Sequence, residues 1–441
     1  MASKMSRLGR LGALTTRVTS SYLGQAVSGA FQSESAREAA LARVHLDNAE
    51  RIVSQLGALK GAAMKVGQQL AQLADGYGLP EETRAVLGRL HDSVEPVPFA
   101  DVRARVEAEL GAGLETRFRS FDPAPLGTAS LGQAHAAELP DGTPVVVKVL
   151  HADIEDSVDA DLGAFKAMLH AGRFVRRPRE EVDAILAEVR ARLVEEMDYR
   201  VEAANLRAFG SFFAGDPDIV VPAVHAEWST SRVLTMERLA GRPLPVFQAT
   251  ASDSAKQRAG VTVARSFLRS LYLFRAVHAD PHPGNYLFTP DGRVGLLDFG
   301  CVRRFDHAWL TDYGGCGLAT RYGDKETCMR HALAIGAISE RAPAAEDVLW
   351  ELCTSIGKPF RGGPYEMGGP ADDVQERVAA VLPRVVLSPQ ILAPRELVFL
   401  HRGLGGAYQM ARAFRARHDW GALFEEVYLQ CRAELANATA P

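Results

Sequence analysis

The stretch formed by residues 277–300 most constrains what this chain can fold into. It reads VHADPHPGNYLFTPDGRVGLLDFG and contains two aspartates, Asp280 and Asp298, with Asn285 between them. Each aspartate sits at the edge of an apolar run. Phosphoryl transfer depends on carboxylate or amide oxygens that hold Mg²⁺ and orient a nucleophile, because positioning and charge neutralisation supply nearly all of the catalysis. The stretch therefore predicts a site for phosphoryl chemistry.

The spacing within this stretch is typical of a kinase. A kinase catalytic loop places an Asn five residues after its Asp, and a DFG tripeptide follows on the next hairpin. Asp280 and Asn285 keep that interval, and Asp298 opens a literal DFG, although Ala279 stands where the usual motif has Arg. Taken alone, an HxD motif also fits an ordinary capped turn, with His278 as a structural histidine. A zinc site here is disfavoured because no convincing further ligand set accompanies the histidines.

The composition excludes several other classes of protein. The formal net charge of −4 gives no global attraction to nucleic acid. The five cysteines are scattered, odd in number and without a CxxC pair, which argues for reduced thiols and against a disulfide framework. Charged residues interrupt every apolar run before it could cross a bilayer. We expect a cytoplasmic protein with no transmembrane segment.

A loop of small residues and a lysine-bearing strand precede the acidic stretch. Residues 125–133 read PLGTASLGQ, and small residues let a backbone approach phosphates closely. Asp141-Gly142 predicts a hairpin turn that leads into a valine-rich strand with Lys148. Lys148 fits an edge lysine that protects against aggregation, and it also fits the kinase lysine that binds the α- and β-phosphates. We expect the following loop residues to contact a nucleotide: Gly127, Ala129 and Ser130.

A glutamate partner for this lysine and an interlobe hinge come next along the chain. Residues 178–213 predict one long amphipathic helix, on which Glu202 can face a site while Asp198 stands one turn before it. Two predicted strands, 219–222 and 233–236, then lead into a hinge. We expect the nucleotide's adenine to meet the backbone there, at Met236, Glu237 and Leu239.

Order and spacing together resemble one family, the UbiB/AarF atypical kinase-like ATPases of quinone metabolism. The resemblance spans residues 59–300. Its motifs are KxGQ at Lys65 to Gln68, the alanine-rich loop at Ala129-Ser130 with Gln133 and His135, ExD at Glu196 to Asp198, and the catalytic loop HADPHPGN at residues 278–285. Gly127 and Thr128 depart from the family, which usually has alanines at these positions.

The resemblance implies that the KxGQ helix packs over the nucleotide cleft, where a protein substrate would otherwise lie. Lys65, with Gln68 in the same extension, would then reach Glu196 or Asp198. These two acids are two residues apart, so a regular helix would not aim both at one lysine. Either the helix is distorted there or only one of the acids pairs.

We expect an α+β, two-lobed protein-kinase-like fold with a helical N-terminal extension packed over the nucleotide cleft and extra C-terminal helices. The expected parts are a basic arm (residues 1–34), the KxGQ extension (35–124), an N-lobe (125–239) and a C-lobe (240–441). Residues 1–32 fit a solvated arm, a membrane-surface helix or a transit peptide.

The expected activity is Mg²⁺-dependent binding of ATP, with hydrolysis or phosphoryl transfer to a non-protein acceptor. Asp280 would orient the attacking oxygen, Asn285 and Asp298 would hold Mg²⁺, and Glu202 would position Lys148. The resemblance implies support of ubiquinone-type quinone biosynthesis, with a lipid or quinone precursor as a partner. Peripheral membrane contact is expected only if residues 1–32 form a membrane-surface helix, and the net charge gives no reason to expect nucleic acid. Two alternatives stay open at this point: a protein Ser/Thr kinase and a non-catalytic nucleotide-binding scaffold.

Overall fold

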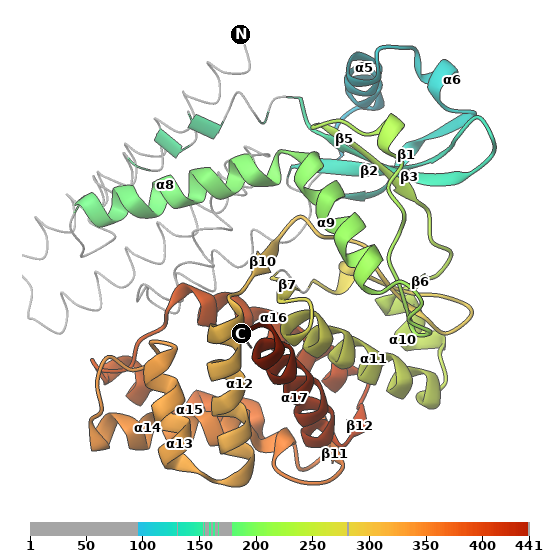
Figure 1. Ribbon diagram of the computed structural model, residues 1–441. Helices are drawn as coiled ribbons and strands as arrows, with labels where there is room; N and C mark the ends of the chain where they lie inside the picture. Colours follow the sequence, from blue (N-terminus) through green and yellow to red (C-terminus); the bar gives the residue numbers. More distant parts are fainter. Residues whose placement is uncertain are drawn as a thin grey trace, which may run out of the picture. The chain divides into compact units, whose positions relative to one another are not determined.

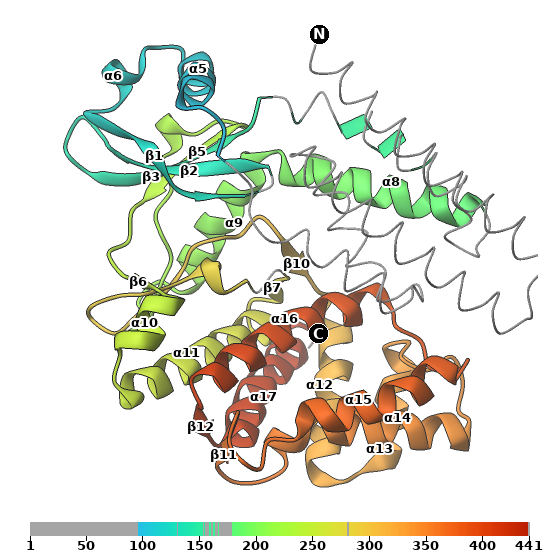
Figure 2. The same cartoon turned by 180° about the vertical axis from the view of Figure 1, so that it is seen from behind.

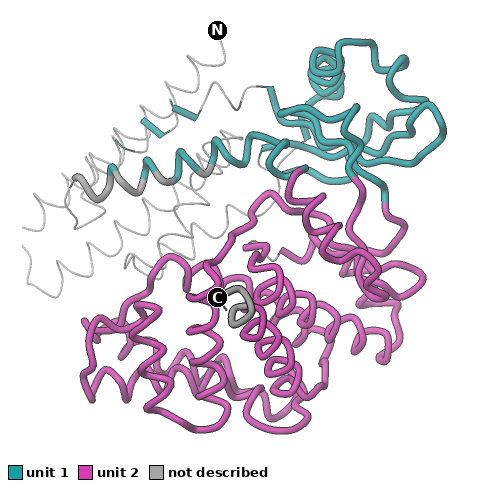
Figure 3. Tube along the Cα trace, in the orientation of Figure 1, with its two compact units in different colours: residues 1–203, 224–238 teal, residues 204–223, 239–441 magenta. Residues whose placement is uncertain are grey.

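The computed structural model describes residues 96–129, 131–152, 154, 158–159, 162–163, 166, 179–279 and 282–439. The chain divides into two compact units (Figure 3). Unit 1 comprises residues 1–203 and 224–238, and unit 2 comprises residues 204–223 and 239–441. The division into four parts drawn from the sequence stays a prediction. Among the described helices, none is both long and apolar enough to cross a membrane.

Unit 1 is built on an antiparallel sheet of four strands (Figure 1). The order is β1 (Ser120–Thr128), β2 (Gly132–Glu138), β3 (Pro144–Leu150) and β5 (Val233–Glu237). The predicted turn joins β2 to β3, and Gly142 in it has φ of 89°, a conformation that glycine adopts without strain. Lys148 pairs with Ala134 on one side and Leu234 on the other. The edge-lysine interpretation is therefore wrong, because β3 is an internal strand.

One face of β3 is apolar and carries the core of unit 1. Val145, Val147 and Val149 are buried and alternate along the strand, so that Lys148 points to the opposite face. The valines pack with α5 (Phe99–Leu110), whose buried residues recur every four positions and whose C-terminal cap is Gly111 at φ 68°. The shorter elements of this unit are α6 (Leu114–Arg117) and η2 (Ala226–Trp228).

The single helix predicted over residues 178–213 is two helices, α8 (Arg179–Glu196) and α9 (Tyr199–Phe212). Asp198 causes the break, because its carboxylate accepts the backbone N–H of Arg200 at 3.0 Å, as an N-cap does. The N–H of Tyr199 donates to the carbonyl of Ser231 at 2.8 Å, which anchors the new helix to the segment before β5. The helix is therefore interrupted within the ExD motif, and which of its two acids pairs with Lys65 stays a prediction. α9 begins in unit 1 and continues in unit 2.

Unit 2 is mainly helical. α16 (Arg395–Ala413) and α17 (Trp420–Thr439) pack against α11 (Asp253–Tyr272), and α17 also packs against α12 (His307–Tyr322) (Figure 2). Tyr272, Trp420 and Tyr428 fill the centre of this core. Polar side chains cap the starts of two of these helices. The Ser252 side chain accepts the N–H of Ala255 at the start of α11, and the Asp306 side chain accepts a backbone N–H at the start of α12. The remaining helices are α10 (Leu244–Thr250), α13 (Lys325–Ala334), α14 (Pro343–Ile356), η4 (Lys358–Phe360) and α15 (Val374–Leu387).

Short strands in unit 2 hold the acidic stretch in place. One sheet has the order β4 (Ile219–Val220), β9 (Val294–Leu296), β8 (Tyr286–Phe288) and β6 (Arg242–Pro243). A second pairs β7 (Ala276–His278) with β10 (Val302–Arg304), and a third pairs β11 (Tyr365–Glu366) with β12 (Arg417–His418). A 3₁₀ turn, η3 (Pro283–Asn285), precedes β8.

Candidate functional site

The hairpin of β8 and β9 brings Asn285 next to Asp298. Its register pairs Tyr286 with Leu296, and the backbone N–H of Leu297 donates to the carbonyl of Asn285 at 2.9 Å. Because Leu297 lies opposite Asn285, Asp298 follows at the same end of the hairpin. Amide and carboxylate oxygens are the ligands that Mg²⁺ prefers in nucleotide sites. The backbone alone therefore places the two predicted metal ligands together.

Asp298 is tied to its surroundings on two sides. Its Oδ1 accepts the backbone N–H of Gly300 at 2.9 Å and lies 3.4 Å from Nε2 of His278. Among the described residues, His278 Nε2 has no hydrogen-bond partner of good geometry, so this second contact is not a hydrogen bond. The carboxylate of Asp298 is about one-third exposed, which leaves it accessible to a ligand.

The pairing of β7 with β10 fixes the start of the catalytic loop. His278 pairs with Val302, and the N–H of Ala279 donates to the carbonyl of Cys301 at 2.7 Å. Ala279 is completely buried. An arginine at this position would bring a guanidinium into a buried place, which is costly without a partner. The packing thus gives a physical reason for the departure from the usual kinase motif.

Phe299 of the DFG tripeptide is held by α9 within unit 2. Its ring is buried and its centroid lies 4.4 Å from that of Phe209. Its carbonyl accepts a hydrogen bond from the side-chain amide of Asn205 at 3.0 Å. The sequence motifs did not identify Asn205 as part of this region. Its position three residues after Glu202, on the same face of the helix, was the feature that could have indicated it.

In unit 1, Lys148 of β3 forms an ion pair with Glu202 of α9. The two side chains are 17% and 6% exposed. A pair this buried is strongly coupled, because removing either partner leaves the other charge uncompensated. The structure therefore brings together the lysine and the glutamate that the sequence suggested, and Glu202 fixes the position of the Lys148 ammonium.

The loop between β1 and β2 depends on Gly132 rather than on Gly127. A Cβ on Gly132 would lie 2.5 Å from the carbonyl of Val149 and 2.6 Å from Oη of Tyr199, whereas one on Gly127 would meet nothing within 4 Å. The loop is closed by the N–H of Ala129, which donates to the carbonyl of Gly132 at 2.8 Å. Gly127 is thus free of close packing, which is compatible with a position that faces a ligand.

Gln133 and His135, both on β2, form a buried hydrogen-bond network. The side-chain oxygen of Gln133 accepts a hydrogen bond from the backbone N–H of Val97. The side-chain nitrogen of Gln133 lies 2.9 Å from Nε2 of His135, and Nδ1 of His135 lies 2.8 Å from the carbonyl of Asp122. Burial lowers the pKa of His135, so the ring is neutral at neutral pH. These two residues of the alanine-rich motif therefore connect β2 to Val97 and to Asp122 of β1.

The predicted hinge residues lie at and after the end of β5. Met236 is buried and pairs with Val146, Glu237 pairs with Val145, and the N–H of Arg238 donates to the carbonyl of Pro144 at 3.1 Å. Leu239 is the first residue of the next segment of unit 2.

Four of the predicted site residues lie outside the described residues: Lys65, Gln68, Ser130 and Asp280. Of the two acids proposed to meet Lys65, Asp198 is engaged by Arg200, whose guanidinium contacts both of its oxygens, at 2.9 and 2.6 Å. This hydrogen bonding lowers the pKa of Asp198. Within the described part of the chain, no three His, Cys, Asp or Glu side chains cluster as metal ligands.

The chain is similar to known proteins of one family. Residues 89–332 match the ABC1 atypical kinase-like domain. The chain is 28% identical to atypical kinase COQ8, mitochondrial, of Saccharomyces cerevisiae, over 97% of this chain and 85% of that protein. It is 30% identical to atypical kinase COQ8B, mitochondrial, of Rattus norvegicus, over 97% of this chain and 81% of that protein. A solved complex of Rv3197 with erythromycin from Mycobacterium tuberculosis has a TM-score of 0.62 at 26% identity, covering 89% of this chain and 98% of that one.

A lysine on an internal strand that forms an ion pair with a helix glutamate, together with a hairpin that brings Asn285 next to a DFG aspartate, defines the class of kinase-like enzymes. Within that class, the chain belongs to the ABC1 atypical kinase-like family. This confirms the α+β kinase-like fold and the family resemblance expected from the sequence. As an atypical kinase, the enzyme binds ATP together with a metal ion.

Proposed function

We propose that this enzyme binds Mg²⁺–ATP and either hydrolyses it or transfers its γ-phosphoryl group to a small non-protein acceptor, in support of isoprenoid quinone biosynthesis. The observation that supports the proposal is the β8–β9 hairpin, in which Asn285, the last residue of the HADPHPGN motif, pairs through its backbone with Leu297, the residue before Asp298. The similarity to the COQ8 kinases supports the link to quinone metabolism.

Each residue has a specific role in this proposal. Asp280 orients the attacking oxygen and accepts its proton, and Asn285 and Asp298 hold Mg²⁺. The bound Mg²⁺ neutralises charge on the β- and γ-phosphates. Glu202 holds the ammonium of Lys148, which binds the α- and β-phosphates.

The rest of the nucleotide site comes from backbone and loop positions. Small residues cover the phosphates, and the segment after β5 meets the adenine. The residues proposed for these contacts are Gly127, Ala129, Ser130, Met236, Glu237 and Leu239.

The KxGQ extension is proposed to replace the docking surface for a protein substrate. Because Arg200 already engages Asp198, we propose Glu196 as the partner of Lys65, with Gln68 in the same extension. We further propose a cytoplasmic location with peripheral membrane contact through residues 1–32, which contain four basic residues together with Leu8, Leu11 and Leu14 at helical spacing.

Turnover and binding measured on the same preparations test the catalytic assignment. Asp280→Asn removes the charge that accepts the proton, so ATP turnover should fall at least about 100-fold while calorimetry still detects Mg²⁺–ATP binding. Asp253→Asn, an exposed aspartate in the first turn of α11, is the matched control and should retain full turnover. Full activity of Asp280→Asn would contradict the assignment.

The nature of the acceptor is tested by turnover with additives. Stimulation by lipid vesicles that contain a quinone precursor supports the proposal. Phosphorylation of added protein would instead indicate a Ser/Thr kinase, and nucleotide binding without turnover would indicate a scaffold.

A further inference from the structure

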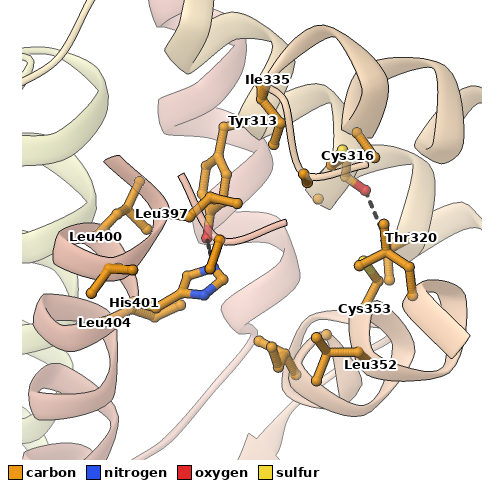
Figure 4. A pocket seen from close by; sticks show the side chains of 18 of the residues that line it. Tyr313, Cys316, Thr320, Ile335, Leu352, Cys353, Leu397, Leu400, His401 and Leu404 are labelled. Carbon is orange, nitrogen blue, oxygen red and sulfur yellow. Dashed lines mark hydrogen bonds between the residues drawn. The ribbon is translucent and has the colours of Figure 1, made fainter. Parts of the chain in front are cut away.

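Unit 2 contains a cavity of about 260 Å³ that the kinase chemistry does not use. Its lining residues come from α11, α12, α14 and α16, with contributions from the ends of α13 and α15 and from the segment between α15 and α16. Figure 4 shows the lining side chains of α12, α14 and α16. Its wall is almost entirely apolar, with residues such as Leu268, Leu349, Leu397 and Leu404. A fully apolar cavity of about 150 Å³ stays dry and binds benzene, and drug-sized pockets begin near 300 Å³. The volume therefore suits a small organic molecule.

One polar pair faces this apolar space. Nε2 of His401 on α16 lies 3.1 Å from Oη of Tyr313 on α12, and both residues line the cavity (Figure 4). The hydroxyl of Thr320, another lining residue, is bound to the carbonyl of Cys316 at 2.8 Å. Burial lowers the pKa of His401 to about 4, so its imidazole is uncharged at neutral pH. The cavity thus offers hydrogen bonding without a net charge, which disfavours an ionic ligand.

The hydrogen-bond inventory of this pair specifies the polar group of a ligand. If the Tyr313 hydroxyl donates to His401, its oxygen keeps only acceptor capacity, and a ligand must donate. If His401 donates instead, the Tyr313 hydroxyl keeps its own proton to donate, and a ligand can accept. A hydroxyl group can do both, so it suits either tautomer of the histidine.

The mouth of the cavity is apolar as well. Leu392 and Val398 line the cavity and are nevertheless 46% and 41% exposed, and Ala393 between them is exposed. Next to Val385, which also lines it, Val386 and Leu387 are 80% and 81% exposed. Large apolar side chains rarely gather on a surface without a binding role. These exposed apolar side chains therefore adjoin the residues that line the cavity, where they can contact a hydrophobic molecule.

We propose that this cavity binds a neutral, mostly apolar molecule with one hydroxyl group, which hydrogen-bonds to Oη of Tyr313. The site lies within unit 2 and stands independently of the ATP chemistry proposed above.

The test is calorimetric titration of the full chain with 1-octanol and with octanoate, without nucleotide. Saturable binding of 1-octanol at one site, with octanoate at least tenfold weaker, is expected. Absence of saturable 1-octanol binding, or equally tight binding of octanoate, overturns the proposal. Because ATP turnover is not the readout, failure here is distinct from failure of the proposed function.

Three variants locate the ligand. Ala393→Trp narrows the mouth and should weaken 1-octanol binding at least tenfold, whereas Ala379→Trp, on the exposed side of α15 and not among the lining residues, should leave binding unchanged. Tyr313→Phe keeps the ring and removes the hydroxyl, and it should weaken binding about three- to tenfold, the value of one hydrogen bond. Unchanged binding in Ala393→Trp, with a normal circular dichroism spectrum, overturns the location, and unchanged binding in Tyr313→Phe overturns the hydrogen bond.

Discussion

The side-chain amide of Asn205 donates a hydrogen bond to the backbone carbonyl of Phe299 at 3.0 Å, although the two residues are 94 positions apart in the chain. Phe299 follows Asp298, so this bond fixes the backbone next to a proposed metal ligand. Asn205→Leu keeps the approximate size but leaves the carbonyl unpaired, and it should lower the free energy of unfolding by about 1–3 kcal/mol. ATP turnover should fall as well, because the DFG segment loses its anchor.

The matched control is Gln257→Leu, which removes an exposed amide that donates to the carbonyl of Arg415 at 3.3 Å. Stability from urea unfolding and steady-state turnover are to be measured for both variants. Wild-type turnover in Asn205→Leu would show that the bond is structural only.

The buried ion pair between Lys148 and Glu202 makes a separate prediction about stability. Lys148→Met leaves the buried charge of Glu202 without a partner and should lower the free energy of unfolding by about 3–5 kcal/mol. The double variant, Lys148→Met with Glu202→Met, should recover much of that loss. Neither variant should bind Mg²⁺–ATP normally. Lys166→Met is the control, because its pair with Asp183 is about half exposed and should contribute no more than about 1 kcal/mol. Similar losses for both lysines would contradict the buried pair.

The two glycines of the β1–β2 region should respond differently to alanine. Gly132→Ala places a methyl group 2.5 Å from a backbone oxygen and should cost about 1–3 kcal/mol of stability. Gly127→Ala meets no neighbour within 4 Å and should change stability by less than about 0.5 kcal/mol. Thermal unfolding of the two variants gives the comparison, and a larger loss for Gly127→Ala would refute it.

Stability should depend on the titration of His401. Burial lowers its pKa to about 4 in the folded state, below the unfolded value of about 6.5. Between these two values the unfolded chain binds a proton that the folded chain does not, so stability falls as pH drops from about 6.5 to about 4. The loss attributable to this residue is about 3 kcal/mol, since each pKa unit corresponds to about 1.4 kcal/mol.

Urea unfolding of the wild type and of His401→Gln between pH 4 and 7.5 measures this contribution of His401 to the free energy of unfolding. Because the glutamine does not titrate, the free energy of unfolding of the variant should decline less steeply with falling pH than that of the wild type. The difference in slope should correspond to about one bound proton. Parallel curves would show that the imidazole is not held neutral.

Local features of this chain were determined by the sequence itself. Periodicity and turn chemistry report the preferences of neighbouring residues directly, and they predicted the turn at Asp141-Gly142 and the valine-rich strand with Lys148. The spacing from Asp280 to Asn285 is likewise read within one short segment. The family motifs identified the kinase-like class for the same reason, since each motif is a short continuous segment.

Tertiary structure decided what depends on distant partners. The helix break at Asp198 requires the carbonyl of Ser231, and the need for Gly132 arises from Val149 and Tyr199, which come close only when strands and helix pack. The bond of Asn205 to Phe299 and the cavity around Tyr313 likewise join segments remote in sequence. Such contacts are set by which buried surfaces meet, and one-dimensional patterns carry no information on that choice.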